Sequence, residues 1–345
     1  MMEKLQTNEL AGLFYGEQQL IVYPIHVCMQ MDGPLQPTRF WGSTLRGAFG
    51  AAFRSVTCVT KASTCEGCES RHHCPYAKAF DADAASLGAG RERGQGVPKP
   101  LLIRAEESRA GEVRFTVILI GQAVCYLPYL IHAVKIMGCR GLGPERVSGR
   151  LHKMWMINPV TWEETVVLAA DSDQVVSAIS GVTLRDIRKW VDGIYPTMLR
   201  IRFTSPWRIK RDGRLVSIWQ FVDMAGAIRR RWAELNRLYG SPSPEAIIAP
   251  AAFDEAAAIQ VQAIEERWKD QPRYSRRQGR RMVLGGIEGT YELRGNLQPY
   301  LPGLLFGSLV HIGKNVTFGM GHYVVESLPF VSLRFDQILS SCSEP

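Results

Sequence analysis

The chain has 345 residues, of which 46% are hydrophobic and 21% are charged. This composition is typical of a folded globular protein and excludes a chain that is disordered throughout, and the length allows two domains with a core in each. The 41 Lys and Arg residues exceed the 33 Asp and Glu residues, which gives a net charge of +8. A basic surplus favours an acidic partner such as nucleic acid, although many enzymes without such a partner are equally basic.

Neither membrane insertion nor secretion is expected from the sequence. No apolar run approaches the roughly 20 residues that a bilayer-spanning helix needs. The first residues, MMEKLQTNEL, contain no apolar segment followed by the cleavage site of a signal peptide. We therefore expect a cytoplasmic protein with no membrane partner. In that compartment the eight cysteines, where they cluster, favour metal binding over disulfides.

The first half of the chain predicts the element order β-α-β-β-α-β. Residues 19–30 alternate in a strand-like way, and apolar side chains repeat at helical spacing over residues 45–56. The remaining expected elements are strands at residues 101–105 and 113–122, a helix at 127–137 and a strand at 152–157. This is the order of a ferredoxin-like unit. We assign this domain to residues 15–160, with a cysteine-rich insert at residues 57–80.

The second half predicts the same order after a connector, residues 161–196, that carries a short helix. The expected elements are a strand at 199–205, a hairpin turn at Asp212 and Gly213, helices at 221–239 and 254–268, a strand at 282–293, a short helix at 300–310 and a strand at 322–328. The expected fold class is therefore α+β, with two tandem ferredoxin-like (RRM-like) domains. The second domain is expected at residues 197–330 and a tail at residues 331–345.

A glycine-rich stretch at residues 311–325, HIGKNVTFGMGHYVV, is the first candidate for binding chemistry. Its candidate residues are Gly313, Lys314, Asn315, Thr317, Gly319 and Gly321. Glycines allow backbone N–H groups to approach a phosphate closely, and a lysine adds a positive charge. The alternative is a flexible turn between a helix and a strand. The stretch is not a Walker loop, because no Gly-Lys-Ser/Thr sequence follows a strand and opens a helix.

A basic run at residues 267–282, RWKDQPRYSRRQGRRM, is the second candidate. Its seven arginines and lysines are accompanied by one acid, Asp270. Cations bind phosphates, and an aromatic ring or a guanidinium plane can stack on an unpaired base. The candidates for RNA binding are Arg273, Tyr274, Arg276, Arg277 and Gln278. The alternative is a solvated basic loop, which is what most charged runs are.

These two stretches resemble the C-terminal half of a known family. WKDQPRYSRRQGRRMVLGGIEGTYEL, followed by LLFGSLVHIGKNVTFGMGHYVVE, is similar to the CRISPR-associated endoribonucleases that process repeat RNA (pre-crRNA) and belong to the RAMP superfamily. STLRGAFGAAF, the spaced cysteines after it and CPYAKAF are similar to the first helix and the cysteine insert of that family. The resemblance covers most of the chain and is weakest over residues 161–196.

The resemblance implies two ferredoxin-like domains and a Gly-rich loop that helps to hold RNA. The implied activity is metal-independent cleavage of a CRISPR repeat, in which a ribose 2′-OH attacks the adjacent phosphate and leaves a 2′,3′-cyclic phosphate and a 5′-OH. Such chemistry needs a base, an acid for the leaving oxygen and a cation near the phosphate, but no cofactor. The implied partners are CRISPR repeat RNA, its crRNA product and subunits of a CRISPR effector complex.

The identity of the general base departs from the family pattern. Members of the family often carry a catalytic His in or just after the first helix, whereas residues 38–56 contain none and offer Arg39 and Arg46. His311 matches the family's His-x-Gly-Lys and can titrate near neutral pH. The catalytic candidates are therefore His311, Lys314 and Arg46, with Arg39 as a candidate for RNA binding.

Other hypotheses remain open at this point. His311 could be a residue that satisfies a carbonyl at the end of a helix. The whole chain could be a RAMP subunit that binds crRNA without cutting it, which the missing His in the first helix favours. A zinc-stabilised DNA-binding protein is a third hypothesis, but no helix has the pattern of a base-reading recognition helix.

Four cysteines, Cys58, Cys65, Cys68 and Cys74, lie within one short segment, and the middle two have the Cys-x-x-Cys spacing of a zinc knuckle. Four thiolates could close a tetrahedral structural zinc site, and His72 or His73 could replace one of them. The alternatives are free thiols and an iron–sulfur cluster. Because four protein ligands leave no position for water, we expect such a metal to be structural and not catalytic.

Overall fold

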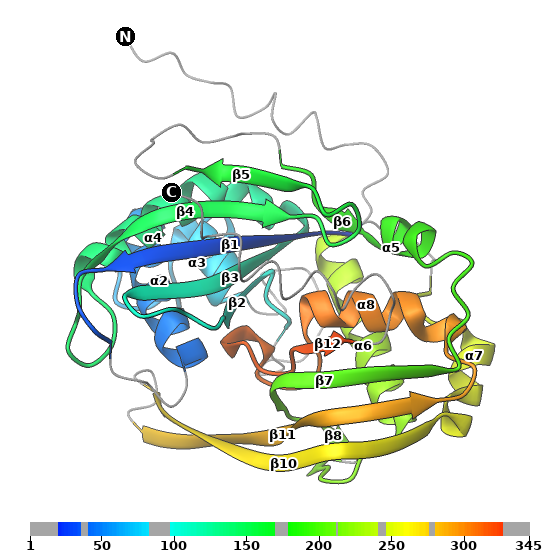
Figure 1. Ribbon diagram of the computed structural model, residues 1–345. Coiled ribbons are helices and arrows are strands. Elements are labelled where there is room, and N and C mark those ends of the chain that lie inside the picture. Colours follow the sequence, from blue (N-terminus) through cyan, green and yellow to red (C-terminus); the bar gives the residue numbers. More distant parts are fainter. Residues whose placement is uncertain are drawn as a thin grey trace.

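The computed structural model of the protein describes residues 20–35, 41–82, 97–169, 179–211, 213–240, 246–275 and 280–326, and for residues 273–275, 280 and 281 it describes the backbone alone. Figure 1 shows a mixed α/β molecule with two large antiparallel sheets, one built from the first half of the chain and one from the second. Within these ranges, no helix is long and apolar enough to cross a membrane.

The first sheet has the strand order β2-β3-β1-β4-β5, and a short strand, β6, pairs with the start of β1. Its strands are β1 (Ile21–Met31), β2 (Leu101–Ala105), β3 (Glu112–Ile120), β4 (Gly149–Ile157), β5 (Glu164–Leu168) and β6 (Val182–Thr183). Helices α2 (Trp41–Thr57) and α4 (Leu127–Arg140) cover one face. The predicted apolar stripe of α2 is buried, because Leu45, Phe49 and Phe53 are each at most 1% exposed.

The second sheet has the strand order β10-β11-β7-β12. Its strands are β7 (Met198–Trp207), β10 (Gln260–Ser275), β11 (Arg280–Arg294) and β12 (Tyr323–Val325), and a small hairpin, β8 (Lys210–Arg211) with β9 (Arg214–Leu215), follows β7. Helices α6 (Phe221–Tyr239) and α8 (Leu301–Val310) pack on the face that Figure 1 shows turned toward the first sheet. The short helices are α3 (Pro75–Phe80), α5 (Leu184–Trp190) and α7 (Pro250–Glu255).

The two halves are built to the same plan. Each follows the order strand, helix, strand, strand, helix, strand, and in each sheet the first of these strands lies between the third and the fourth. The mixed α/β fold with antiparallel sheets that the sequence predicts is therefore confirmed.

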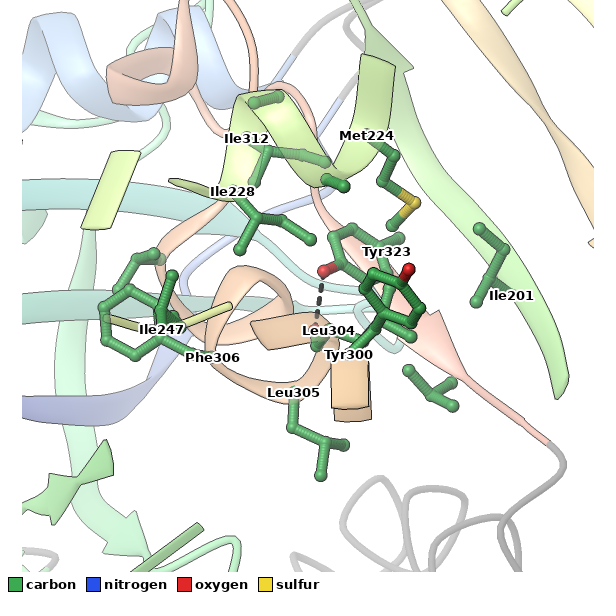
Figure 2. Packing of buried hydrophobic residues seen from close by; sticks show 14 of the residues in the cluster. Ile201, Met224, Ile228, Ile247, Tyr300, Leu304, Leu305, Phe306, Ile312 and Tyr323 are labelled. Atoms are coloured by element: carbon green, nitrogen blue, oxygen red, sulfur yellow. Dashed lines mark hydrogen bonds between the residues drawn. The ribbon is translucent and has the colours of Figure 1, made fainter. Parts of the chain in front are cut away.

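One apolar core is shared by both halves. It contains Leu102 and Ile118 on the face of the first sheet that α2 does not cover, together with Ile201 and Phe203 of β7. Figure 2 shows its centre around α6 and α8, where the Tyr323 hydroxyl donates to the Leu304 carbonyl oxygen at 2.6 Å. The shared core holds the two sheets in a fixed relation, because separating them would expose these side chains to water.

The structure contradicts one predicted element and adds to another. The helix expected at residues 254–268 is wrong, because α7 and a single 3-10 turn end at Ala258 and the long strand β10 begins at Gln260. Pairing with β11 along nearly the whole of β10 supplies backbone hydrogen bonds, which override the helix propensity of an Ala- and Glu-rich segment. The expected connector, residues 161–196, supplies β5 and β6 to the first sheet as well as the short helix α5.

Candidate nucleic-acid interface

The Gly-rich loop, defined here as residues 311–322, joins α8 to β12 and lies against the end of β7. The Lys314 N–H donates to the Arg208 carbonyl oxygen at 2.8 Å, and the Gly321 N–H donates to that of Pro206 at 3.0 Å. A third bond, from the Ile312 N–H to the Gly321 carbonyl oxygen at 3.1 Å, closes the loop on itself. The path of the loop is therefore set by backbone hydrogen bonds to a strand of its own domain.

The glycines of the loop are required by contacts with the protein's own backbone. Gly313, Gly319 and Gly321 all have positive φ values, of 91°, 80° and 72°. A Cβ atom would lie 2.6 Å from the Arg208 carbonyl oxygen at Gly313, and 2.9 Å from the carbonyl oxygen of Ile103, in β2 of the first half, at Gly319. Packing alone thus explains these glycines, and the loop touches both halves of the molecule.

The polar residues of the loop differ in their accessibility. Lys314 is exposed, whereas Asn315, in the left-handed conformation with φ 62°, and Thr317 are half-buried. Beside Lys314, the side chain of Arg208 donates to the Gly285 carbonyl oxygen of β11 at 2.8 Å. Arg208, which the sequence analysis missed because it lies outside both candidate stretches, therefore joins the loop to the β10–β11 hairpin.

The β10–β11 hairpin carries the predicted basic run. Its register runs to the pair Ser275–Arg280, and Arg273 pairs with Met282, three positions beyond the pair Asp270–Gly285. Arg273 and Tyr274 lie on β10, but only their backbone is described, and Arg276, Arg277 and Gln278 lie outside the described residues. The backbone nevertheless brings the two candidate stretches to the same end of the second sheet.

Arg46 of α2 meets the loop from the first half of the molecule. Its guanidinium carbon lies 4.8 Å from the centre of the Phe80 ring of α3 and 5.3 Å from that of Phe318 in the loop. Cation–π contacts of this kind are strongest where the cation is partly shielded from water, as it is for half-buried Arg46. The structure thus brings Arg46 and the loop together, while Arg39 lies outside the described residues.

His311 does not face the surface. It is 0% exposed, and its Nδ1 lies 3.2 Å from the Met320 carbonyl oxygen. Burial, then the nearby charge of Arg104, holds its pKa well below the usual histidine range. In this position it cannot touch an RNA at the surface, because a buried neutral ring has no route to a bound ribose without movement of the loop.

A polar network that sequence analysis did not find lies behind the loop and crosses between the two halves. Arg104 of β2 donates to His322 Nε2 at 2.6 Å and to Glu106 Oε1 at 3.0 Å. The same Glu106 oxygen lies 3.0 Å from His26 Nδ1 of β1. Burial alone would raise the pKa of Glu106, but the charges of His26 and Arg104, with hydrogen bonds from His26 and Thr116, hold it below the usual range.

Two family models match the chain. Residues 201–323, which contain the loop and the hairpin, match the model of the CRISPR-associated endoribonuclease Cas6. This part of the chain is therefore a Cas6-family domain. Residues 19–179 match a second model, AF_1859_N, which is described as an N-terminal domain. The resemblance stated from the sequence motifs is therefore confirmed for the half that carries the two candidate stretches.

A single protein and two solved structures extend the likeness over most of the chain. An uncharacterized protein of Archaeoglobus fulgidus is 23% identical over 297 residues, which are 84% of this chain and 92% of that protein. The structure of Thermus thermophilus Cas6 aligns over 89% of this chain and 98% of its own, with 15% identity and a TM-score of 0.51. A chain of a partial Cas6-RT-Cas1–Cas2 complex aligns over 90% of this chain and 47% of its own, with 16% identity and a TM-score of 0.55. At these identities, the solved structures show a shared fold.

The cysteine-rich segment that was expected as an insert, residues 57–80, places its four cysteines around one pocket. Cys58, Cys65, Cys68 and Cys74 line a space of about 240 Å³ together with His73. The structure nevertheless contains, in the part of the chain that it describes, no group of three or more His, Cys, Asp or Glu side chains arranged to hold a metal ion. Structural zinc at these cysteines therefore stays a prediction.

Proposed function

We propose that the protein binds CRISPR repeat RNA and cleaves the precursor transcript to give mature crRNA, with two tandem ferredoxin-like domains sharing the RNA. The observation that carries this proposal is the meeting of the Gly-rich loop and the β10–β11 hairpin at one end of the second sheet, within the Cas6-family domain at residues 201–323. Two segments that would be unrelated turns in another fold are neighbours here.

Charge at this end of the molecule supports the proposal. Lys314 is exposed on the loop, Arg208 lies next to it, and the hairpin continues into a run of arginines. Lysine and arginine side chains neutralise phosphates and release the counterions that surround them. The net charge of +8 has the same sign as this local surplus.

The chemistry that we propose is attack by a ribose 2′-OH on the adjacent phosphate. The new O–P bond closes a 2′,3′-cyclic phosphate, and the bond to the 5′ oxygen breaks and leaves a 5′-OH. Lys314 would stabilise the negative charge that grows on the phosphate, because a cation fixed in place needs no reorganisation during the step. His311 would act only through the loop that it anchors, and Arg46 would hold Phe318 and not the RNA.

A non-cutting crRNA-binding subunit of a CRISPR effector complex is the second candidate. The observation that favours it is that α2 contains no histidine and that both histidines of the loop, His311 and His322, are buried. Binding needs only the cations and the hairpin, whereas cutting also needs groups that move protons.

A cleavage assay separates the two candidates. The purified protein would be incubated in EDTA with an end-labelled repeat RNA from the CRISPR array of its source organism, beside copies of that RNA with a single 2′-deoxy substitution at each position. One cut that a single 2′-deoxy abolishes supports the endoribonuclease and locates the site. Tight binding without a cut supports the non-cutting subunit, and the absence of both contradicts the proposed function.

A further inference from the structure

The contact between Arg104 and His322 joins the two domains at the C-terminal end of the Gly-rich loop. Arg104 lies on β2 of the first sheet, and His322 directly precedes β12 of the second. Because a guanidinium only donates hydrogen bonds, His322 Nε2 must accept at this 2.6 Å contact, and its Nδ1 therefore carries the proton. That Nδ1 lies 2.5 Å from the Thr204 hydroxyl, to which it donates.

His322 is held at a third point by its own backbone, since its N–H donates to the Ser205 hydroxyl at 2.9 Å. Its ring also lies 5.0 Å from the ring of His311, which begins the loop. Both ends of the loop therefore meet at one place. If His322 moved, its ring contact would move His311 as well. Lys314 would move with them, because it lies only three residues after His311.

Arg104 is in turn fixed by the first sheet. Its second terminal nitrogen donates to Glu106 Oε1 and to the Thr116 hydroxyl of β3, both at 3.0 Å. Directly beside it, the position of a Cβ at Gly319 lies 3.3 Å from the Arg104 Cα. The guanidinium thus donates to two side chains of the first domain and to one of the second. Lysine cannot reproduce this planar arrangement of donors.

We propose that Arg104 is a positioning residue, which holds the Gly-rich loop in its RNA-binding conformation from the opposite domain. This inference rests on the proposed function in one respect, namely that the loop binds RNA. It adds that the affinity of a loop in the Cas6-family domain is set by a residue outside that domain. Preorganisation of the loop lowers the entropy that RNA binding would otherwise cost.

Two substitutions of His322 separate a positioning role from a general structural one. In His322→Gln, the side-chain oxygen reaches the position of Nε2 and can still accept from Arg104. In His322→Asn, the amide nitrogen takes the position of Nδ1 and keeps the bond to Thr204, but the contact with Arg104 is lost. Both variants remove the ring from the same buried place. Because Asn is one methylene smaller than Gln, the thermal midpoint is measured beside the affinity, which separates a loss of packing from the loss of the contact.

The experiment measures repeat-RNA affinity, thermal midpoint and amide hydrogen exchange of residues 311–322 in the full-length chain. We expect Arg104→Met and His322→Asn to weaken binding about tenfold and to speed exchange in the loop, with His322→Gln close to wild type. Arg150→Met, which removes an exposed arginine of β4 in the same domain, is the matched control and should change neither quantity.

Equal losses of affinity and of thermal midpoint in the Gln and Asn variants would overturn the proposal, and so would unchanged loop exchange in Arg104→Met. Failure of the proposed function looks different. In that case the wild-type protein does not bind repeat RNA, while the exchange measurement still reports whether Arg104 holds the loop.

Discussion

The Gly-rich loop and the cysteine-rich insert both follow directly after a helix, but they are held in different ways. The loop bonds to β7 through its backbone, packs against β2 and buries two histidines. The insert after Thr57 bonds mainly to itself, as from the Cys68 N–H to the Cys65 carbonyl oxygen, and most of its side chains are exposed. The conformation of the loop is therefore fixed by the whole fold, whereas that of the insert depends on local contacts and on whatever its cysteines bind.

Gly321→Ala and Gly67→Ala test this comparison most directly, because the two glycines have nearly the same φ, 72° and 71°. A Cβ at Gly321 would lie 1.9 Å from the Ile312 carbonyl oxygen, whereas a Cβ at Gly67, in the insert, would meet no atom within 4 Å. We expect the loop variant to lose about 3 kcal/mol or more of unfolding free energy. The insert variant should lose about 1 kcal/mol, from the left-handed backbone alone. Urea unfolding measures both, and equal losses would contradict the comparison.

Acidification should have the next largest effect, which is a loss of unfolding free energy caused by the two buried histidines of the loop. Burial, then the charge of Arg104, holds the pKa of His311 and of His322 well below the usual range. Below about pH 6.5 the unfolded chain therefore binds protons that these folded side chains do not, so the unfolding free energy falls by up to about 1.4 kcal/mol per pH unit for each histidine. Urea titrations across this range measure the slope. The His322→Gln variant should have a smaller slope, and an unchanged one would show that His322 is not the source.

Removal of one cation should have a smaller effect, on RNA binding alone. Lys314→Ala should weaken repeat-RNA affinity about fivefold and lower the dependence of log affinity on log salt by about one, because one released counterion is lost. The control is Lys78→Ala, which removes an exposed lysine of α3 at the end of the insert. Titrations at several salt concentrations measure both variants, and identical salt slopes would remove Lys314 from the interface.

Among the changes to the fold, loss of an insert cysteine should have the smallest effect. If zinc is bound, purified protein contains about one zinc per chain, and Cys65→Ser lowers that content while global stability changes by about 1 kcal/mol or less, since the insert is held locally. Cys139→Ser, at an exposed position on α4, should leave the metal content unchanged. Elemental analysis measures the zinc content per chain. Wild-type protein without metal would contradict the zinc prediction and would mean that the insert is held by its local contacts alone.

Much of the architecture could be predicted because the spacing of apolar side chains within a segment indicates a helix or a strand. The spacing of Leu45, Phe49 and Phe53 identified α2, and the alternation in residues 19–30 identified β1. The helix expected at residues 254–268 failed because its partner strand, β11, had not been assigned to that segment. A pattern within one segment carries no information on which distant segment will supply its hydrogen bonds.

The site was harder to predict for the same reason. The loop and the hairpin could be found by composition, but the burial of His311 depends on packing by both halves of the chain. Arg104 and His322 are 218 positions apart in the sequence. Arg104 lies outside both candidate stretches, and the Gly-rich stretch that contains His322 does not show which distant residue its side chain contacts. Arg208 lies just after β7 and outside both candidate stretches, and only the fold shows that it lies between them.

The apolar core that the two sheets share has a consequence for the shape of the RNA. Many two-domain proteins adjust to a ligand by rotating one domain against the other, but here such a rotation would open the contact of Leu102 and Ile118 with the second half. The angle between the domains is therefore set before any RNA arrives. If RNA binds across both domains, as proposed, it would have to match this angle, so selection among RNAs would favour those that deform at low cost in free energy.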